Sequence, residues 1–168
     1  MKIKDIMTAT SLKYCNPETK LHNAARAMKS GNCGALPVVD KNKKVVGIIT
    51  DRDIALSMAK KHPLPASQLS VEKIMSKKIH SVYPEDDISS ALHEMRTYQV
   101  GRLPVVDRQG KLKGIVSLHN LLSGSLKKEN GEFENLSSNG ENINKTIKAL
   151  TDRYSPRQEK KTKLRTAL

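Results

Sequence analysis

One segment of this 168-residue chain occurs twice. Residues 34–53 read GALPVVDKNKKVVGIITDRD and residues 101–120 read GRLPVVDRQGKLKGIVSLHN, at a constant offset of 67. Glycine, proline and aspartate stay in register, so that Pro37 aligns with Pro104 and Gly47 with Gly114. A self-match of this length predicts one structural unit that is used twice.

Each copy has the pattern of a β-hairpin preceded by a helix. Two short apolar runs rich in β-branched residues flank an Asp-led polar turn, which predicts two adjacent strands. Apolar residues at helical spacing come before each hairpin and predict one helix face packed on a sheet. The first helix is expected to begin at Thr19 as N-cap and to close at Gly31-Asn32 with a left-handed residue. The two apolar stripes are Leu21, Ala24, Ala25, Met28 and Ile88, Ala91, Leu92, Met95.

Short leading strands are expected before each helix, at residues 1–8 and near residues 12–15 in the first copy. The sequence Lys73-Ile74-Met75-Ser76 repeats Asp5-Ile6-Met7-Thr8 before the second copy. A further helix is expected from Asp51 to about Lys61, with its counterpart starting at Leu118. Each copy therefore has the predicted order strand, strand, helix, strand, strand, helix.

The predicted fold class is α/β (α+β): tandem pseudo-two-fold repeats, each a small sheet flanked by two helices. Repeat 1 spans 1–61, a proline-containing linker spans 62–70, and repeat 2 spans 71–123. A unit of about 60 residues buries only roughly 60% of its unfolded surface, so the two repeats are expected to pack into one domain. Residues 124–168 form a basic extension that is predicted to be partly disordered, with a possible short helix at 143–154. Its apolar stripe is Ile143, Ile147, Leu150 and Tyr154.

The net charge of +13 is spread over the chain. Residues 1–123 carry 20 basic and 11 acidic residues, and the remaining 45 carry 10 and 6. This balance fits an anionic ligand or partner, such as a nucleotide, an RNA or an acidic protein. Apolar runs are too short to span a membrane and the N-terminus is charged, so we expect a cytoplasmic protein without a membrane partner. Cys15 and Cys33 lack metal-ligand spacing and are expected to be buried free thiols, and no metal site is predicted.

The end of the second strand is where chemistry is expected. A carboxylate at Asp53 is suited to accept hydrogen bonds from both hydroxyls of a ribose. The hydroxyl of Thr50 and the backbone N–H groups at Asp51 are suited to meet a phosphate. The alternative is that Thr50 and Asp53 only cap a helix, which is a common use of this residue pair.

The second copy carries a different version of this pattern. Ser117 replaces Thr50, and the neutral Asn120 replaces Asp53, so its site is expected to be weaker or differently selective. Arg102 stands where the first copy has Ala35. A guanidinium there is suited to contact a phosphate, or else it faces solvent at the start of a strand.

These motifs closely resemble the CBS (cystathionine β-synthase) domain family, whose domains pair into a Bateman module. The resemblance covers residues 1 to about 123 and rests on Asp5-Ile6-Met7-Thr8, on residues 34–40 and 47–53, and on their second copies. It implies a regulatory module that binds AMP, ADP or ATP, sometimes S-adenosylmethionine or NAD, in clefts between the repeats. It also implies a disc-like homodimer.

The resemblance assigns candidate ligand residues position by position. Thr50 and Asp53 would hold phosphate and ribose, Ser117 matches the family's hydroxyl, and Asn120 departs from its Asp. Basic residues in the family's Gly-(Arg/His)-x-Pro stretch contact phosphates, which matches Arg102. Residues beside the leading strands line the base pocket. The remaining candidates are Met7, Thr8, Met75 and Ser76 beside those strands, Asp51 at the helix start, and Ala35, Pro37 and Pro104 of the Gly-x-x-Pro stretches.

Three hypotheses follow. The leading one is an adenine-nucleotide sensor that signals ligand occupancy to an unknown effector protein. The second is a nucleic-acid-associated regulator that uses the basic C-terminal extension, which is otherwise a solvated tail or a contact for an acidic protein. The third is an enzyme, but no nucleophile, metal cluster or paired acid and base stands out in the sequence, so no catalytic residue or catalytic cofactor is predicted.

Overall fold

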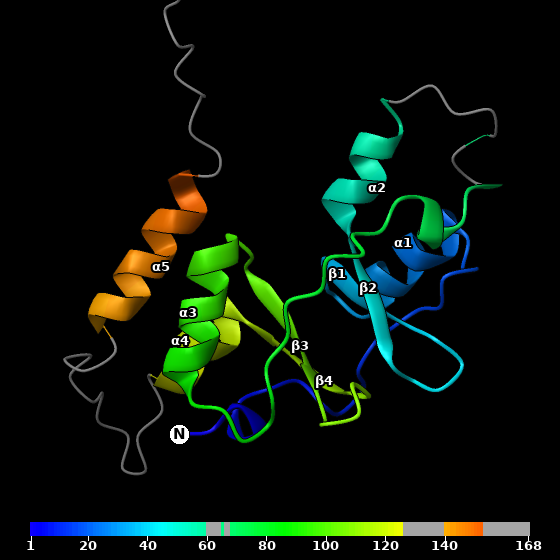
Figure 1. The fold of residues 1–168 in the computed structure, drawn as a ribbon. Coiled ribbons are helices and arrows are strands. Elements are labelled where there is room, and N and C mark those ends of the chain that lie inside the picture. The colour runs from blue at the N-terminus through cyan, green and yellow to red at the C-terminus, as the bar shows by residue number, and fades with distance from the viewer. Residues whose placement is uncertain (60–64, 66–67, 126–139, 153–168) are drawn as a thin grey trace, which may run out of the picture.

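The two repeats form two similar layers, each a β-hairpin covered by helices (Figure 1). The computed structural model describes residues 1–59, 65, 68–125 and 140–152. The first repeat contains α1 (Leu21–Ser30), β1 (Ala35–Val39), β2 (Val45–Thr50) and α2 (Asp51–Ser57). The prediction of paired repeats with mixed helices and strands is confirmed.

The second repeat contains α3 (Ile88–Tyr98), β3 (Arg102–Val106), β4 (Leu112–Ser117) and α4 (Leu118–Ser125). Both hairpins are antiparallel and have equivalent registers, because β1 pairs with β2 and β3 pairs with β4 at positions 67 residues apart. The tips of the two hairpins also pair with each other: the backbone N–H of Val45 donates to the carbonyl of Gly110 at 3.0 Å.

Each leading segment pairs with the hairpin of the other repeat. The backbones of Thr8 and Ile115 in β4 exchange two hydrogen bonds of 2.9 and 3.1 Å. The backbones of Ser76 and Ile48 in β2 exchange two bonds of 3.0 Å. In Figure 1 the N-terminal segment accordingly lies beside β4. The repeats are therefore interlocked.

The leading segments also contribute side chains to the hydrophobic core of the other repeat. Ile3, which is fully buried, belongs to the cluster of second-repeat residues that includes Leu92 and Leu103. Leu69 and Val71 belong to the cluster of first-repeat residues. Burial of apolar surface contributes roughly 25 cal/mol per Å², so each core is stabilised by a segment from the other repeat.

One glycine in each hairpin makes room for the crossing segment. A methyl group at Gly114 would lie 2.9 Å from the Thr8 carbonyl oxygen and 2.9 Å from the Met7 sulfur. A methyl group at Gly47 would lie 3.0 Å from the Ser76 carbonyl oxygen. The backbone of the leading segment thus occupies the space of a side chain. Only glycine fits at these positions without a shift of the segment.

Two local expectations differ from the structure. Residues 1–8 are not one extended strand, because Ile3–Asp5 is a 3-10 helix whose Asp5 carboxylate accepts a 2.8 Å bond from the N–H of Lys2. Val71–Lys73 forms the equivalent 3-10 helix. Thr19 is not the cap of α1: its hydroxyl accepts a 3.1 Å bond from the Asn16 N–H, and the cap position is Lys20.

The end of α1 follows the prediction: Asn32 is left-handed, with φ of 44°, directly after Gly31. The two cysteines differ from each other. Cys15 is buried, and this burial raises the pKa of its thiol to about 11. Cys33 is only half-buried, because it lies in the loop beyond α1.

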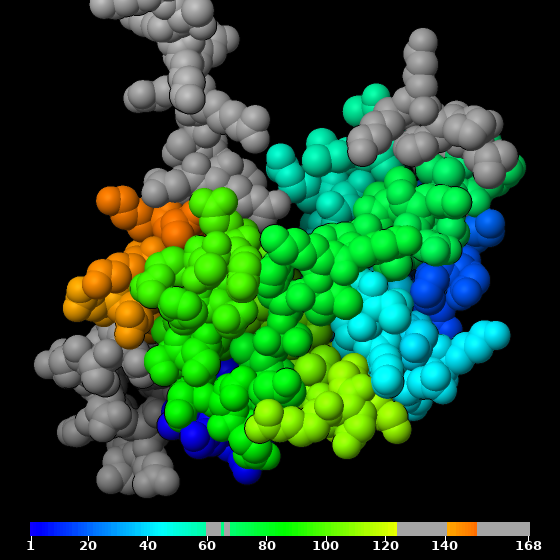
Figure 2. Space-filling model, in the orientation of Figure 1, coloured from blue at the N-terminus to red at the C-terminus, as the bar shows by residue number. Residues whose placement is uncertain are grey.

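A further helix, α5 (Gly140–Asp152), packs along α3 (Figures 1 and 2). Ile143 is buried in the core of the second repeat. The buried hydroxyl of Thr146 donates to the carbonyl of Leu92 at 3.3 Å and to that of Asn142 at 2.7 Å. The side-chain amide of Gln99 donates to the carbonyl of Ala149 at 3.4 Å. Tyr154 of the expected stripe and the basic end lie outside the described residues.

No helix among residues 1–59, 68–125 and 140–152 is both long and apolar enough to cross a membrane. The boundaries expected at residues 61, 70 and 123 stay predictions, and residues 60–64 and 66–67 of the linker region lie outside the described residues.

We predict that Gly114→Ala destabilises the fold, because the added methyl group collides with the backbone of the crossing segment. Overpacking of this kind costs about 1–3 kcal/mol. Urea unfolding monitored by circular dichroism measures the change. The matched control is Gly101→Ala, because a methyl group at Gly101 would have no atom within 4 Å. Equal stabilities of the two variants would contradict the crossing.

Candidate functional site

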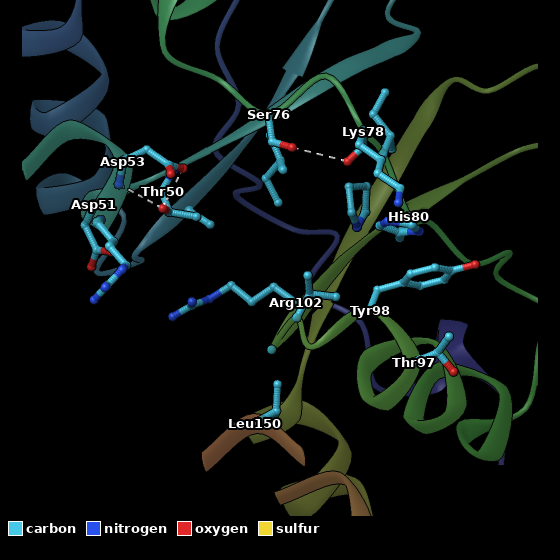
Figure 3. Close-up of a pocket in the computed structure, with 17 residues that line it drawn as sticks. Thr50, Asp51, Asp53, Ser76, Lys78, His80, Thr97, Tyr98, Arg102 and Leu150 are labelled. Carbon is cyan, nitrogen blue, oxygen red and sulfur yellow. Dashed lines mark hydrogen bonds between the residues drawn. The ribbon is translucent and has the colours of Figure 1, made fainter. Parts of the chain in front are cut away.

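A cleft of about 750 Å³ opens between the two repeats (Figure 3). Its first side is the junction of β2 and α2, with Thr50, Asp51 and Asp53. Its opposite side carries Lys78 and His80, which follow the crossing segment. Residues of both repeats therefore form this first cleft.

The β2–α2 junction is held by a reciprocal cap. The backbone N–H and the hydroxyl of Thr50 both donate to Oδ2 of Asp53, at 2.9 and 2.7 Å. The Asp53 N–H donates back to the Thr50 hydroxyl at 3.2 Å. Thr50 and Asp53 therefore do cap α2, which was the alternative interpretation of this pair. The cap employs one carboxylate oxygen, and among the described residues no hydrogen bond to Oδ1 of Asp53 is present. Capping and ligand contact are thus compatible.

The opposite side of the first cleft has an aromatic pair. The rings of His80 and Tyr98 stack with centroids 3.4 Å apart. Burial and the nearby Lys78 ammonium lower the pKa of His80 below its ordinary value of 6.5, while Glu94 acts in the opposite direction. Burial and Lys78 thus favour the neutral form of the His80 ring. The charge on this side comes from Lys78, whose Nζ lies 5.8 Å from the Tyr98 ring centroid.

Arg102 extends between the two sides, toward Asp51 (Figure 3). A methyl group at Gly34 would lie 2.7 Å from Oδ2 of Asp51 and 3.3 Å from Nη2 of Arg102, so both charged groups approach this glycine. The described residues give the exposed Arg102 no ion pair within 4.0 Å. Its planar fork is available to an anion in the cleft.

A second cleft, of about 490 Å³, is related to the first by the pseudo-two-fold. Ser117 and Asn120 of the β4–α4 junction line it together with Thr8 of the first crossing segment and Lys13, which follows that segment. The backbone N–H and the hydroxyl of Ser117 donate to Oδ1 of Asn120 at 2.9 and 2.6 Å. The cap of the first repeat is thus retained with an amide.

Comparison with known proteins agrees with this geometry. The family model described as CBS domain matches residues 3–60 and 71–127. This chain belongs to the CBS domain family. The uncharacterized protein YlbB of Bacillus subtilis is 41% identical to it over 122 residues, which are 71% of this chain and 79% of YlbB.

Two solved CBS domain structures resemble the fold closely. The CBS domain pair of MJ0100, in complex with 5′-methylthioadenosine and S-adenosyl-L-methionine, has a TM-score of 0.66 at 27% identity and covers 76% of this chain and 98% of that one. CBSX2 in complex with AMP has a TM-score of 0.65 at 26% identity, covering 74% and 96%.

Enzymes also match this CBS domain pair, over part of their length. Homoserine O-acetyltransferase of Methanococcus vannielii is 30% identical over 119 residues, which are 71% of this chain and 24% of the enzyme. Within the described residues no group of three or more His, Cys, Asp or Glu side chains is placed to hold a metal ion.

The structure brings most of the candidate residues to the two clefts and leaves three outside. Met7 and Met75 pack against the hydrophobic cores beside Gly114 and Gly47, and Pro37 lies in β1; their contact with a base stays a prediction. The first cleft contains Ala35, Thr50, Asp51, Asp53, Ser76, Arg102 and Pro104. The second contains Thr8, Ala35, Arg102, Ser117 and Asn120.

The sequence analysis missed the cleft residues that come from the crossing segments and from α5. Lys78 and His80 follow Ser76 closely, so the repeated Ile-Met-Ser/Thr motif was a signal for them. Tyr98 and Leu150 lie in the first cleft at the ends of α3 and α5, and no pattern in the sequence places them there. Lys13 and His119 of the second cleft were missed in the same way.

We predict that the His80 ring titrates below pH 6.5, since burial and Lys78 disfavour its cation. Lys78→Gln is expected to raise the midpoint, and Glu94→Gln to lower it. Following the His80 ring protons by NMR from pH 4.5 to 8 measures all three. A titration midpoint of His80 that is at or above 6.5 and does not change in either variant would contradict the arrangement of this side of the cleft.

Proposed function

We propose that the protein is a regulatory module that binds an adenine nucleotide (AMP, ADP or ATP) in the first cleft and signals occupancy to an effector protein. The observation that carries the proposal is the carboxylate of Asp53. One of its oxygens holds the cap, and the other is unbonded among the described residues, in a cleft that Arg102 also enters.

The ribose is assigned to Asp53. A carboxylate oxygen accepts hydrogen bonds from hydroxyl donors, and such charge-assisted bonds are roughly twice as strong as neutral ones. The cap fixes the Asp53 side chain before the ligand arrives, since two hydrogen bonds join its carboxylate to Thr50 and a third joins its backbone N–H to the Thr50 hydroxyl. A fixed acceptor loses little conformational entropy on binding.

The phosphate is assigned to Arg102, with Lys78 on the opposite side of the cleft. A guanidinium fork matches two phosphate oxygens, and an ammonium adds a point charge. The base is assigned to the half-buried apolar side chains of Ile48 and Ile79, which line the cleft beside Ser76. The complexes of the MJ0100 pair with adenosine compounds and of CBSX2 with AMP support this ligand class.

We predict that Asp53→Asn weakens AMP binding by roughly ten- to a hundredfold, which corresponds to about 1.5–3 kcal/mol for a charged hydrogen bond. Asparagine retains the cap, as Asn120 shows in the second repeat, so the substitution removes the charge and not the junction. Isothermal titration calorimetry measures the affinity.

The control is Asp40→Asn in the first hairpin turn. Asp40 accepts backbone bonds from Asn42 and Lys44 and lines neither cleft. This variant should bind AMP as the wild type does. Unchanged affinity in Asp53→Asn would remove the ribose assignment.

We infer that α5 carries the signal. Leu150 lines the first cleft, and so do Thr97 and Tyr98 at the end of α3, the helix against which α5 packs. A ligand that contacts these groups binds better when α5 is docked, and it therefore shifts the population toward the docked state. The effector protein and the homodimer remain part of this proposal. The basic C-terminal residues that suggest a nucleic-acid partner lie outside the described residues.

We predict that saturating AMP slows amide hydrogen exchange in residues 140–152. The expected factor is about 5 to 150, the usual range of a coupling free energy. Leu150→Ala should reduce the effect, because it removes the contact between α5 and the cleft. Asn144→Ala, on the exposed face of α5, should leave it intact. If AMP binds but the amide hydrogen exchange of residues 140–152 does not change, α5 does not transmit ligand occupancy.

A further inference from the structure

We propose that the second cleft binds a phosphate-bearing anion in preference to a ribose diol, because its described side chains present hydrogen-bond donors and positive charge but no carboxylate that accepts from the diol. The two clefts would then be unequal: the first binds the ribose and the phosphate of a nucleotide, and the second binds a phosphate without the ribose. The assignment rests on the proposed function only in taking the first cleft as the ribose site.

The orientation of the Asn120 amide is the first step. Its Oδ1 accepts two hydrogen bonds, from the N–H of Ser117 at 2.9 Å and from the Ser117 hydroxyl at 2.6 Å. A flipped amide would direct N–H groups at those two donors, so the cap fixes the orientation. The group left for a ligand is therefore Nδ2, a donor.

Asp53 presents the opposite polarity from the same position. Its Oδ2 accepts the two bonds from Thr50, and the remaining atom is the acceptor Oδ1. Both junctions are otherwise alike, because the back-donated bond from residue 53 or 120 is 3.2 Å long in each. Replacement of one oxygen by an NH₂ group thus converts an acceptor site into a donor site.

The charged side chains of the second cleft are also suited to an anion. The described residues that line it include the cations Lys13 and Arg102, and no aspartate or glutamate. The first cleft contains two aspartates, Asp51 and Asp53, beside the cations Arg52, Lys78 and Arg102. A phosphate offers only acceptors and negative charge at neutral pH, which the donors of the second cleft match. A diol finds no carboxylate there.

The phosphate has two conceivable sources. It is either a free anion or the phosphate chain of a nucleotide held in the first cleft. The second source is sterically reasonable because Ala35, Gly101 and Arg102 line both clefts. The shared chemistry is a phosphate group on Asn120 Nδ2 and Lys13, beside the Arg102 that also lines the first cleft, and competition distinguishes the sources.

The test compares the substitutions Asn120→Asp and Asp53→Asn, with the binding of inorganic pyrophosphate and of AMP measured by calorimetry. Asn120→Asp keeps the cap, as Asp53 shows, but places a carboxylate in the second cleft. Pyrophosphate affinity should fall at least tenfold in Asn120→Asp and stay unchanged in Asp53→Asn. The wild type should bind one AMP per chain, and Asn120→Asp should gain a second AMP. Asn23→Asp, on the exposed face of α1 outside both clefts, controls for the added charge.

The proposal is overturned if pyrophosphate does not bind the wild type, if it binds Asn120→Asp equally well, or if Asn23→Asp weakens it to the same extent. Displacement of pyrophosphate by ATP but not by AMP supports the nucleotide chain as the source, and resistance to both supports a free anion. Failure of the first-cleft assignment gives a separate signal, because it appears as AMP binding that does not respond to Asp53→Asn.

Discussion

Each leading segment crosses the hairpin of the other repeat over a glycine, and the position of both clefts depends on this crossing. The carbonyl oxygen of Thr8 would lie only 2.9 Å from a Cβ atom at Gly114, and that of Ser76 only 3.0 Å from a Cβ atom at Gly47. Two hydrogen bonds fix each crossing, and Ile3 and Val71 bury their side chains in the core of the opposite repeat. A repeat on its own would lack one edge of its sheet and part of its core.

The crossing makes each cleft a joint product of two repeats. Residues that follow a crossing, such as Lys78 or Lys13, face the capped junction of the other repeat, Thr50–Asp53 or Ser117–Asn120. The fold therefore supplies two equivalent cavities, and single side chains make them different. Asp53 and Asn120 differ by a single side-chain atom. The free oxygen of Asp53 accepts hydrogen bonds, whereas the free NH₂ group of Asn120 donates them. Helix α5 adds a further difference, because its Leu150 reaches only the first cleft.

Local patterns in the sequence were sufficient for the repeats, the hairpins and the strand-end residues. Asp40 and Asp107 accept backbone bonds within their own turns, and Thr50 and Asp53 are three residues apart, so short-range chemistry determines these features. The crossing was not predictable in this way, because Thr8 pairs with Ile115 and the alternation pattern does not say which sheet a strand joins. Tyr98 and Leu150 meet in the first cleft for the same long-range reason. The sequence showed that Asn120 is neutral, but only the two bonds from Ser117 show which of its atoms is left for a ligand.

The most direct test of the account is a crystal structure of the protein with AMP at saturating concentration. The account predicts a ribose with its hydroxyls at hydrogen-bond distance, about 2.6–3.2 Å, from Oδ1 of Asp53, and a phosphate on the guanidinium of Arg102. A first cleft that stays empty, or that the protein's own side chains fill, would contradict it.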